Sequence, residues 1–314
     1  MVRILIVISP HQATSAGKTT ALCGLAFHLV TEERGVWLGR LVGDTDADSD
    51  ASLFAAIPGA LSPGRPLSIE EAKAQLSALD GEVALIEAGR EQSIAALSQQ
   101  LDARVVLVVR GFDEETLPSV AAMAGGIAPA PLGVVATTVA ESQAKSIVEA
   151  IEGTGARCLA ALPEDRRLAA PTVAQAKEAL AARVLCGDGN SDAPIEYSII
   201  APISADAGGP YFAKWRDKAV LTRADRPDLA LAALATDTAC LILTAGVEPL
   251  PYIIDRASRG KTPVLLTQLE TRDAARRIES MFGVMPLSGE KKRTRAAELL
   301  RAHVDKEVLA SLLN

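Results

Sequence analysis

The sequence predicts an α/β fold with parallel sheets, divided between two domains. Short runs rich in Val, Ile and Leu alternate with longer amphipathic segments from end to end, which is typical of parallel strands buried on both faces by helices. With 314 residues, of which 49% are apolar, the chain is long enough for one large core or two modest ones. Gly, Asn, Ser, Asp and Pro cluster at 186–197, and we expect the linker between the domains there.

In the first domain each expected strand is followed by an expected helix. The strands are 3–8, 36–42, 82–87, 104–109, 132–137 and 157–162. The helices lie near 18–32, 69–79, 91–101, 114–124, 141–152 and 172–183. The helix near 69 has the clearest start, because Ser68 is followed three residues later by Glu71, which is the pattern of a capping box.

After the linker the alternation begins again. Strands are expected at 197–202, 219–222, 240–246 and 263–268, with a helix after each. We therefore expect a first domain at 1–187, a smaller α/β domain at 188–286 and a C-terminal helical tail at 287–314. The tail carries an apolar stripe, which is explained by packing against the body of the chain or against a second subunit.

Composition argues against several classes of protein. The net charge is −7, and no run of Lys and Arg is interleaved with aromatic residues, so we expect no nucleic-acid partner. The four cysteines lie far apart without CxxC spacing, which favours free thiols in a reducing cytoplasm. The apolar stretch at 1–9 is too short to span a membrane and leads to no cleavage site, so we expect a cytoplasmic protein without a membrane partner.

The stretch "SPHQATSAGKTT" at 9–20 predicts a phosphate-binding loop. It follows an apolar strand and opens a helix, whose free N–H groups and dipole stabilise phosphate. Gly17, Lys18 and Thr19 satisfy the second half of the phosphate-loop pattern, but Gln12 stands where the first glycine belongs. The alternative is an ordinary polar turn. The candidate phosphate-binding residues are Thr14, Ser15, Ala16, Gly17, Lys18, Thr19 and Thr20.

Acidic residues that could complete a magnesium shell occur in two places. The segment "GDTDADSD" at 43–50 offers Asp44, Asp46, Asp48 and Asp50. Glu87 ends the strand at 82–87, and ligands of open α/β sheets collect at such strand ends. A calcium-binding loop is excluded because Ser49 and Ala55 occupy its Gly and Glu positions. For the aspartates, a solvated loop remains an equal alternative.

These residues resemble the dethiobiotin synthetase-like branch of P-loop proteins. That branch includes cobyrinic acid a,c-diamide synthase-type amidoligases and the N-terminal region of long phosphate acetyltransferases, and "LPEDRRLAAPTVAQAKEAL" at 162–180 is similar to the closing segment of the latter. In the synthetases the first glycine falls on His11, so this chain lacks it in either alignment. The resemblance implies a P-loop three-layer domain with a mostly parallel sheet, in which Thr19, Asp50 and Glu87 bind Mg²⁺.

The second half is similar to the DRTGG domain that follows the P-loop domain in the same proteins. The resemblance lies in "ADRPDLALAAL" at 224–234 and "LILTAG" at 241–246. Asp225, Arg226 and Gly246 match the signature and are the implied ligand-facing residues, whereas Pro227 and Ala245 replace the usual Thr and first Gly. The alternative is that Asp225 and Arg226 cap the helix that follows. The two resemblances together extend from residue 3 to about 283.

Two departures from the family bear on the ligand. The synthetases carry a substrate lysine where this chain has Arg40, which keeps its proton and can clamp a phosphate or carboxylate. Thr137 stands where many members have an asparagine that reads adenine, so we expect weaker selectivity for the base. Arg40 and Thr137 thus join the candidate nucleotide-binding residues.

The function that these features favour is a nucleotide- or metabolite-binding regulatory protein of the phosphate acetyltransferase N-terminal type, with ATP and Mg²⁺ as ligands. Because the chain lacks the residues that carry acetyl transfer in the long enzymes, we expect no acetyltransferase activity. The alternative is an ATP- and Mg²⁺-dependent ligase acting on a carboxylate or carbamate, and a scaffold without ligand is a third possibility. A homodimer and a partner enzyme are the expected assemblies.

Overall fold

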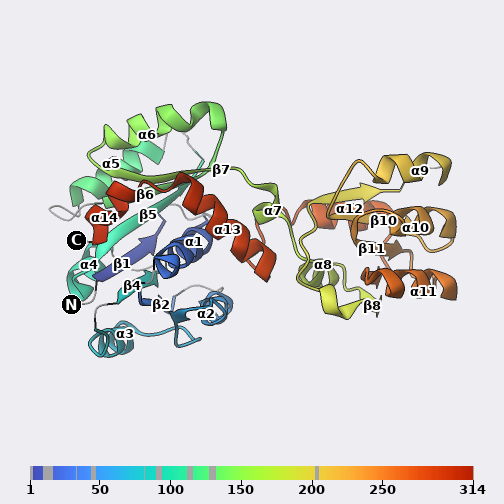
Figure 1. The fold of residues 1–314 in the computed structure, drawn as a ribbon, viewed down its shortest axis with the longest axis horizontal. Coiled ribbons are helices and arrows are strands. Elements are labelled where there is room, and N and C mark those ends of the chain that lie inside the picture. Colours follow the sequence, from blue (N-terminus) through green and yellow to red (C-terminus); the bar gives the residue numbers. More distant parts are fainter. Residues whose placement is uncertain are drawn as a thin grey trace. The chain divides into compact units, whose positions relative to one another are not determined.

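The computed structural model describes residues 3–9, 17–32, 34–43, 47–80, 82–89, 94–111, 116–126, 132–201 and 205–313, and the statements below concern these. The chain forms two compact units (Figure 1). The first consists of Met1–Asp165 together with Arg293–Asn314, and the second of Arg166–Lys292. The chain therefore leaves the first unit and returns to it at its C-terminal end.

The first unit contains a seven-stranded sheet in the order β3-β2-β4-β1-β5-β6-β7. All neighbouring pairs are parallel, and the central strands are apolar and almost completely buried. The strands are β1 Arg3–Ile8, β2 Val36–Arg40, β3 Ala60–Leu61, β4 Val83–Glu87, β5 Arg104–Arg110, β6 Leu132–Val139 and β7 Arg157–Pro163. This confirms the predicted α/β fold with a mostly parallel sheet.

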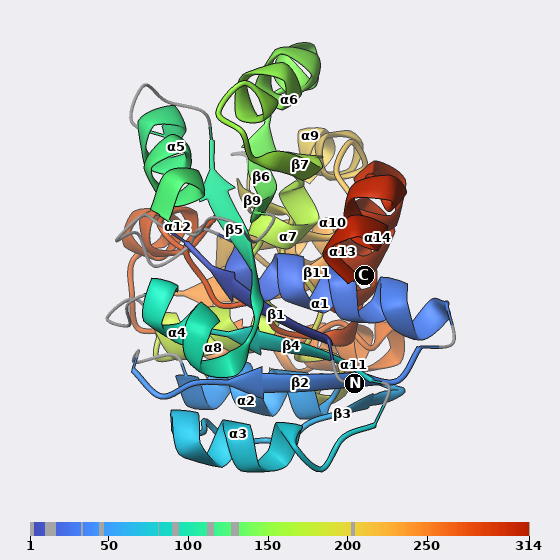
Figure 2. The same ribbon diagram turned by 90° about the vertical axis from the view of Figure 1, so that its left-hand side faces the viewer.

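Helices cover both faces of this sheet (Figure 2). Side chains of α3, α4, α5 and α6 join one apolar core with residues from the strands, and α1, α13 and α14 lie over the other face. The helices are α1 Lys18–Thr31, α2 Ala47–Ala55, α3 Ile69–Leu76, α4 Ile94–Leu101, α5 Thr116–Gly126, the 3₁₀ turn η1 Glu141–Gln143, α6 Ala144–Glu152, α13 Glu290–His303 and α14 Lys306–Leu313. The capping box at Ser68 and Glu71 is present at the start of α3, as predicted.

The C-terminal helices pack on the first unit. The amide of Asp305 donates to the carbonyl of Leu159 at 2.8 Å, and a Cβ on Gly24 of α1 would meet Leu300 Cβ at 2.9 Å. Leu312 of α14 is buried against Gly133 of β6. Of the two explanations for the apolar stripe of the tail, the structure shows packing against the body of the chain.

The second unit contains a five-stranded sheet in the order β8-β12-β11-β10-β9. Strand β8 is antiparallel to β12, and the other pairs are parallel. The strands are β8 Arg183–Cys186, β9 Tyr197–Ile200, β10 Lys218–Arg223, β11 Thr238–Thr244 and β12 Val264–Leu266. The helices are α7 Arg166–Ala169, α8 Val173–Ala179, the 3₁₀ turn η2 Asp188–Asn190, α9 Ala205–Phe212, α10 Pro227–Leu234, α11 Pro251–Gly260 and α12 Thr271–Glu279. Two apolar cores line the two faces of this sheet.

The division into units differs from the expected boundary between 187 and 188. Strand β8 pairs with β12, and α8 buries Val173 and Ala176 in the same core as Ile278 of α12. Residues 166–187 therefore belong to the second unit, and the segment 186–197 connects two of its strands. At the other end, 293–314 joins the first unit instead of forming a separate tail.

Two elements of the first unit were not expected from the sequence. Strand β3 has only two residues, and helix α2 includes part of the acidic segment for which a solvated loop was one alternative. Asp48 and Asp50 lie in the first turn of α2, where negative charge stabilises the helix dipole. Within the described ranges, no helix has both the length and the apolar character needed to cross a membrane.

Candidate functional site

The candidate site lies where three neighbouring strands end and α1 begins. In the sheet, β4 lies between β2 and β1, and Glu87 is the register partner of both Arg40 and Val7. Because all three strands run in the same direction, their carboxyl ends meet at one edge, which is where open α/β sheets bind ligands. Helix α1 starts at Lys18, and its first two side chains contact the end of β4 and Asp50 of α2, as described below.

Gly17 precedes α1 in a left-handed conformation, with φ at 82°. A side chain is unfavourable there, and an added Cβ would also lie 3.2 Å from Thr137 Cγ2. The Thr137 hydroxyl donates to the carbonyl of Val109 at 3.2 Å. The structure thus brings Thr137, at the end region of β6, against the glycine that precedes α1 in the predicted phosphate loop.

The first two residues of α1 point at Glu87. Lys18 Nζ lies 3.7 Å from Glu87 Oε1 and donates to the carbonyl of Ala88 at 3.2 Å. The Thr19 hydroxyl lies 3.3 Å from Glu87 Oε1 and 3.4 Å from Asp50 Oδ1. Thr19, Asp50 and Glu87, which were predicted as Mg²⁺ ligands from three separate segments, are therefore neighbours in the fold.

Arg40 completes the cluster from the end of β2. Its side chain is 1% exposed, and its Nε lies 3.3 Å from Asp50 Oδ2 and 4.0 Å from Glu87 Oε1. Its Nη1 donates to the carbonyls of Leu41 at 3.0 Å and Glu87 at 3.4 Å. The guanidinium is thus held by backbone as well as by carboxylates.

The environment of Glu87 disfavours its charge. Burial raises the pKa of Glu87 to about 7, the nearby Asp50 carboxylate raises it as well, and Arg40, Lys18 and the Thr19 hydroxyl oppose the shift. Its Oε2 atom is buried, and none of the described residues offers it a hydrogen bond. A buried carboxylate oxygen without a partner is costly, and a cation or a ligand donor would satisfy it.

The donors of this cluster fit magnesium. Two carboxylates and a threonine hydroxyl are hard oxygen ligands, and Mg²⁺ is commonly held by one or two carboxylates plus water and substrate phosphate. In the described part of the chain, no group of three or more His, Cys, Asp or Glu side chains is arranged to hold a metal ion. A metal here would thus share its coordination with Thr19 and with a ligand.

The other predicted residues of the first unit are not brought to the cluster or lie outside the described residues. Thr14, Ser15, Ala16, Asp44 and Asp46 lie outside them. Thr20 is the third residue of α1 and is half-buried. Asp48 is exposed on α2, where its carbonyl accepts from Ser52.

In the second unit, the predicted ligand-facing residues lie at the ends of two adjacent strands. Asp225 and Arg226 follow β10, and Gly246 follows β11. Asp225 pairs with Arg223 at 3.2 Å and Arg226 with Asp228 at 2.7 Å, so each is engaged by a residue two positions away. The alternative that these side chains cap α10 is not observed, since its N-cap is Arg226 without a side-chain capping bond.

The glycine signature after β11 adopts left-handed backbone. Gly246 has φ at 66°, a backbone conformation that disfavours a side chain, and an added Cβ would meet the flexible end of the exposed Gln268 side chain. Ala245, which replaces the family's first glycine, has φ at 63° and so carries the strain that glycine avoids.

A pocket of about 520 Å³ in the second unit was not predicted from the sequence. It lies at the amino ends of β9, β10 and β11, opposite the edge that carries Asp225 and Gly246. Its lining residues are Arg167, Glu196, Tyr197, Lys214, Trp215, Arg216, Asp217 and Asp237. The run "KWRDK" at 214–218 was the signal available in the sequence, but the other residues come from distant segments.

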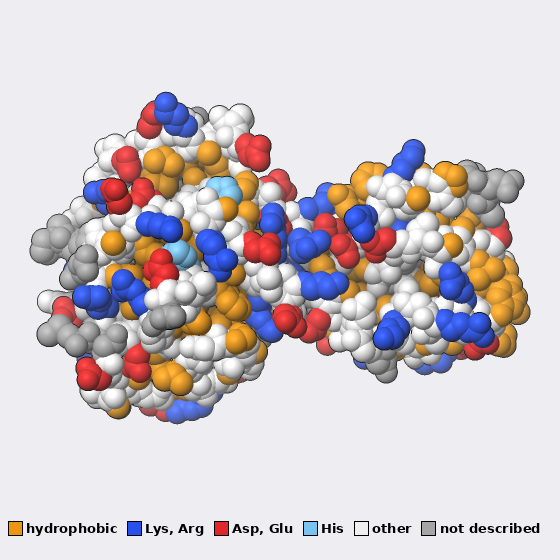
Figure 3. All heavy atoms as spheres, in the orientation of Figure 1, with side chains coloured by type: hydrophobic (Ala, Val, Ile, Leu, Met, Phe, Trp, Pro, Cys, Tyr) orange, Lys and Arg blue, Asp and Glu red, His pale blue; other side chains and the backbone are white. Residues whose placement is uncertain are grey.

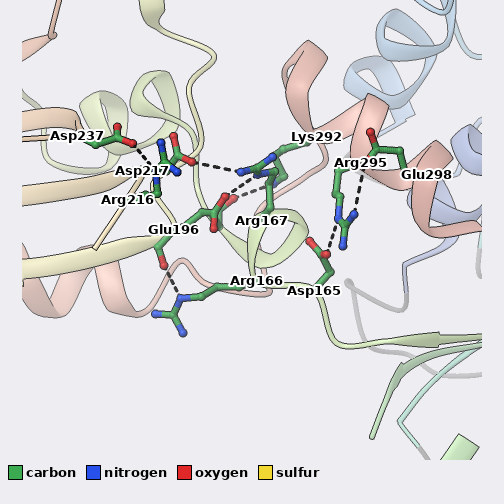
Figure 4. A network of polar contacts seen from close by, with 11 residues as sticks. Asp165, Arg166, Arg167, Glu196, Arg216, Asp217, Asp237, Lys292, Arg295 and Glu298 are labelled. Atoms are coloured by element: carbon green, nitrogen blue, oxygen red, sulfur yellow. Dashed lines mark hydrogen bonds and ion pairs between the residues drawn. The ribbon is translucent and has the colours of Figure 1, made fainter. Parts of the chain in front are cut away.

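The charges in this pocket pair with each other (Figure 4). Arg167 lies 2.5 Å from Glu196 and 3.2 Å from Asp217, and Arg216 lies 3.1 Å from Asp237. Arg167 of α7 thus connects the residue before β9 with the loop before β10, and Arg216 of that loop pairs with the residue before β11.

Comparison with known proteins identifies the second unit. The family model of the DRTGG domain matches residues 175–281, which confirms that part of the predicted resemblance. The phosphate acetyltransferase of Nitratidesulfovibrio vulgaris is 26% identical over 280 residues. That similarity covers 84% of this chain and 38% of the relative, so the chain spans well under half of the relative's length.

Solved structures show partial likenesses to this chain. One is the regulatory region of Clostridium perfringens pyrophosphatase, with its CBS and DRTGG domains, complexed with the activator diadenosine tetraphosphate. It is 18% identical with a TM-score of 0.34, and the match covers 40% of this chain and 56% of that chain. Another is the MinD cell division protein of Aquifex aeolicus, which is 12% identical with a TM-score of 0.39. The match covers 53% of this chain and 84% of that chain. Scores this low carry no inference about function.

Proposed function

We propose that this chain is a nucleotide- or metabolite-binding regulatory protein of the phosphate acetyltransferase N-terminal type. The observation that carries the proposal is the cluster at the start of α1, where Lys18 and Thr19 meet Asp50 and Glu87 at the carboxyl end of the sheet. The sequence similarity to a phosphate acetyltransferase over 84% of the chain supports the same assignment.

In this proposal the ligand's phosphates bind at the N-terminus of α1. The free N–H groups and dipole of the helix favour an anion there, and the Lys18 ammonium adds a full charge. Gly17 lets the backbone approach the phosphates, and Thr14, Ser15, Ala16 and Thr20 belong to the same site by the sequence pattern. Thr137, which touches Gly17, would contact the nucleoside or metabolite beyond the phosphates.

Thr19, Asp50 and Glu87 would hold Mg²⁺ in the complex. When bound, the ion would neutralise phosphate charge. Two carboxylates and one hydroxyl make the cluster suited to such an ion, as does Glu87 Oε2, which receives no hydrogen bond from the described residues.

The DRTGG domain would bind a second ligand and pass its state to a partner enzyme or to a second copy of the chain. We assign Asp225, Arg226 and Gly246 to that ligand because they lie at the carboxyl ends of β10 and β11. Apolar side chains also gather on the surface of this unit over α10 and α11, where Leu231, Leu250 and Tyr252 are exposed (Figure 3). This surface is a candidate for homodimer contact.

Arg40 favours one second candidate function, an ATP- and Mg²⁺-dependent ligase. A buried guanidinium that approaches Glu87, as Lys18 and Thr19 also do, would orient a carboxylate or carbamate for attack on a γ-phosphate. In that case the same cluster would support phosphoryl transfer as well as binding.

Calorimetric titration of MgATP, MgADP and GTP separates these functions. Lys18→Ala should weaken nucleotide binding by about tenfold to a hundredfold, because it removes a charge-assisted contact to phosphate. Lys145→Ala is the matched control, since Lys145 is an exposed lysine of the same unit. Phosphate release is then followed with and without diamino carboxylic acids. Binding without turnover supports the regulatory protein, turnover that Lys18→Ala abolishes supports the ligase, and absence of binding contradicts both.

A further inference from the structure

The guanidinium of Arg40 occupies the space between the two carboxylates that were assigned to a metal. Its Nε approaches Asp50 Oδ2 at 3.3 Å and Glu87 Oε1 at 4.0 Å. Its Nη1 is fixed by the carbonyls of Leu41 and Glu87. All three side chains are buried, at 1%, 9% and 2% exposure for Arg40, Asp50 and Glu87.

This arrangement balances charge within the protein. Two carboxylates face two cationic side chains, Arg40 and Lys18, so the cluster is formally neutral when all four groups are ionised. An arginine side chain does not lose its proton in proteins, so Arg40 supplies its charge at every working pH. A divalent ion that entered beside it would face repulsion from a fixed positive charge at short range.

The carboxylate oxygens are also largely committed. Asp50 Oδ2 accepts from Arg40 and Asp50 Oδ1 from Thr19, while Glu87 Oε1 is near Lys18, Thr19 and Arg40. Glu87 Oε2 is the oxygen to which the described residues give no hydrogen bond. As far as the described residues extend, a metal ion would find this one carboxylate oxygen available, and it would gain the others only when Arg40 moves away.

We propose that Arg40 is a resident counter-cation that competes with a divalent metal ion for Asp50 and Glu87. The metal binds well only when an anionic ligand, a carboxylate or phosphate group, draws the guanidinium away, since its planar fork matches either group with two hydrogen bonds. Metal and anionic ligand then strengthen each other's binding, as linkage requires. This inference rests on the proposed function, because it concerns the same site and adds that Arg40 regulates metal binding there.

The test uses Mn²⁺ alone as the probe, with free Mn²⁺ followed by electron paramagnetic resonance during titration of the full chain. Arg40→Gln should bind Mn²⁺ about tenfold or more tightly than the wild type, because a buried carboxylate pair loses its competing charge. Arg34→Gln is the matched control, since it removes the same charge from an exposed position, and it should bind Mn²⁺ as the wild type does. Adding Asp50→Asn to Arg40→Gln should abolish the gain.

A folded Arg40→Gln variant with wild-type Mn²⁺ affinity would overturn the inference. If this variant does not fold, Arg40→Lys carries the test, because it keeps the charge on a side chain without the fork. Arg40→Lys should show a smaller gain in Mn²⁺ affinity, and no gain would overturn the inference. In the wild type, inorganic phosphate should tighten Mn²⁺ binding, once the Mn²⁺ bound to phosphate in solution is subtracted. An unchanged Mn²⁺ affinity in the presence of phosphate would also overturn the inference.

Failure of this inference is distinct from failure of the proposed function. If Arg40→Gln gains Mn²⁺ affinity but the wild type binds no nucleotide, the competition by Arg40 is supported and the proposed function is not. If nucleotide binds and Arg40→Gln gains no Mn²⁺ affinity, the function is supported and the competition is overturned.

Discussion

Replacing Gly17 by alanine tests the geometry of the phosphate loop at its best defined residue. Gly17 combines φ of 82° with a Cβ position 3.2 Å from Thr137 Cγ2. An L-residue in left-handed backbone costs about 1–2 kcal/mol. The close contact adds about 1 kcal/mol of overpacking.

The entropy of the unfolded chain offsets part of this cost. Gly→Ala restricts the unfolded state and so favours the folded one by about 0.4–1 kcal/mol. The expected net destabilisation of the first unit by Gly17→Ala is therefore about 2 kcal/mol. In a unit of this size, that corresponds to a Tm lower by about 4–8 °C.

Thr137→Ser separates the two contributions. Serine keeps the hydroxyl that donates to the carbonyl of Val109. It removes the Thr137 methyl group, which is the atom that the new Cβ in Gly17→Ala would meet. In a double-mutant cycle followed by urea unfolding, we expect a coupling energy of about 1 kcal/mol that favours the double variant, while the left-handed strain persists. Gly125→Ala is the control, because Gly125 lies in α5 with open space around its Cβ position, and it should be neutral or stabilising.

The reasoning is refuted if Gly17→Ala unfolds at the same urea concentration as the wild type. It is also refuted in part if Thr137→Ser gives no coupling, since the contact between these two residues would then be absent in solution.

Three further predictions concern other parts of the fold. Lys292 is buried against the carbonyl of Ala170, and burial lowers its pKa to about 8, so the folded state binds this proton less readily than the unfolded state. The resulting destabilisation is fully present below pH 8 and is relieved as pH rises toward 10.5. In urea titrations over that window, the free energy of unfolding of the wild type should rise by about 3 kcal/mol relative to that of Lys292→Met. Lys291→Met, which changes an exposed lysine, should follow the wild type. Leu312→Ala should destabilise the first unit by about 2–5 kcal/mol in thermal unfolding, because it empties the contact of α14 with β6, and a change below about 1 kcal/mol would place α14 elsewhere. Ala245→Gly should stabilise the second unit by about 1 kcal/mol by relieving left-handed backbone, and a loss of stability would contradict that conformation.

One rule explains why the sequence could indicate where the candidate site lies. Parallel strands end at the same edge, so residues that follow different strands are brought together even when they are far apart in sequence. This rule pointed to Glu87, whereas the phosphate-loop pattern indicated Thr19 and the family resemblance indicated Asp50. The structure makes these three side chains neighbours, and their role as Mg²⁺ ligands stays a prediction. The capping box at Ser68 was readable because its two partners are three residues apart.

The features that were missed depend on contacts that leave little local pattern. Strand β8 joins the second unit through an antiparallel pairing with β12, which lies far along the chain, so the boundary was expected too late. Strand β3 has two residues, which is too short for a periodic signal. The partners of Asp225 and Arg226 were also missed, because each side chain pairs with an oppositely charged neighbour two positions away.

The contact between Arg40 and the acidic pair illustrates the same limit inside the site. The sequence placed Arg40 within the strand expected at 36–42, and the family resemblance indicated that it could bind an anionic ligand. The fold adds that Asp50 and Glu87 already provide it with anionic partners. Only the register of β2 against β4 and the position of α2 bring these three side chains together.

The central claim is that the start of α1 binds the phosphates of a nucleotide or metabolite. Its most direct test is the calorimetric comparison of MgATP binding to the wild type, Lys18→Ala and Lys145→Ala. The account predicts one saturable site per chain that weakens by at least about tenfold in Lys18→Ala and is unchanged in Lys145→Ala. Equal binding by all three proteins, or no binding by the wild type, would contradict it.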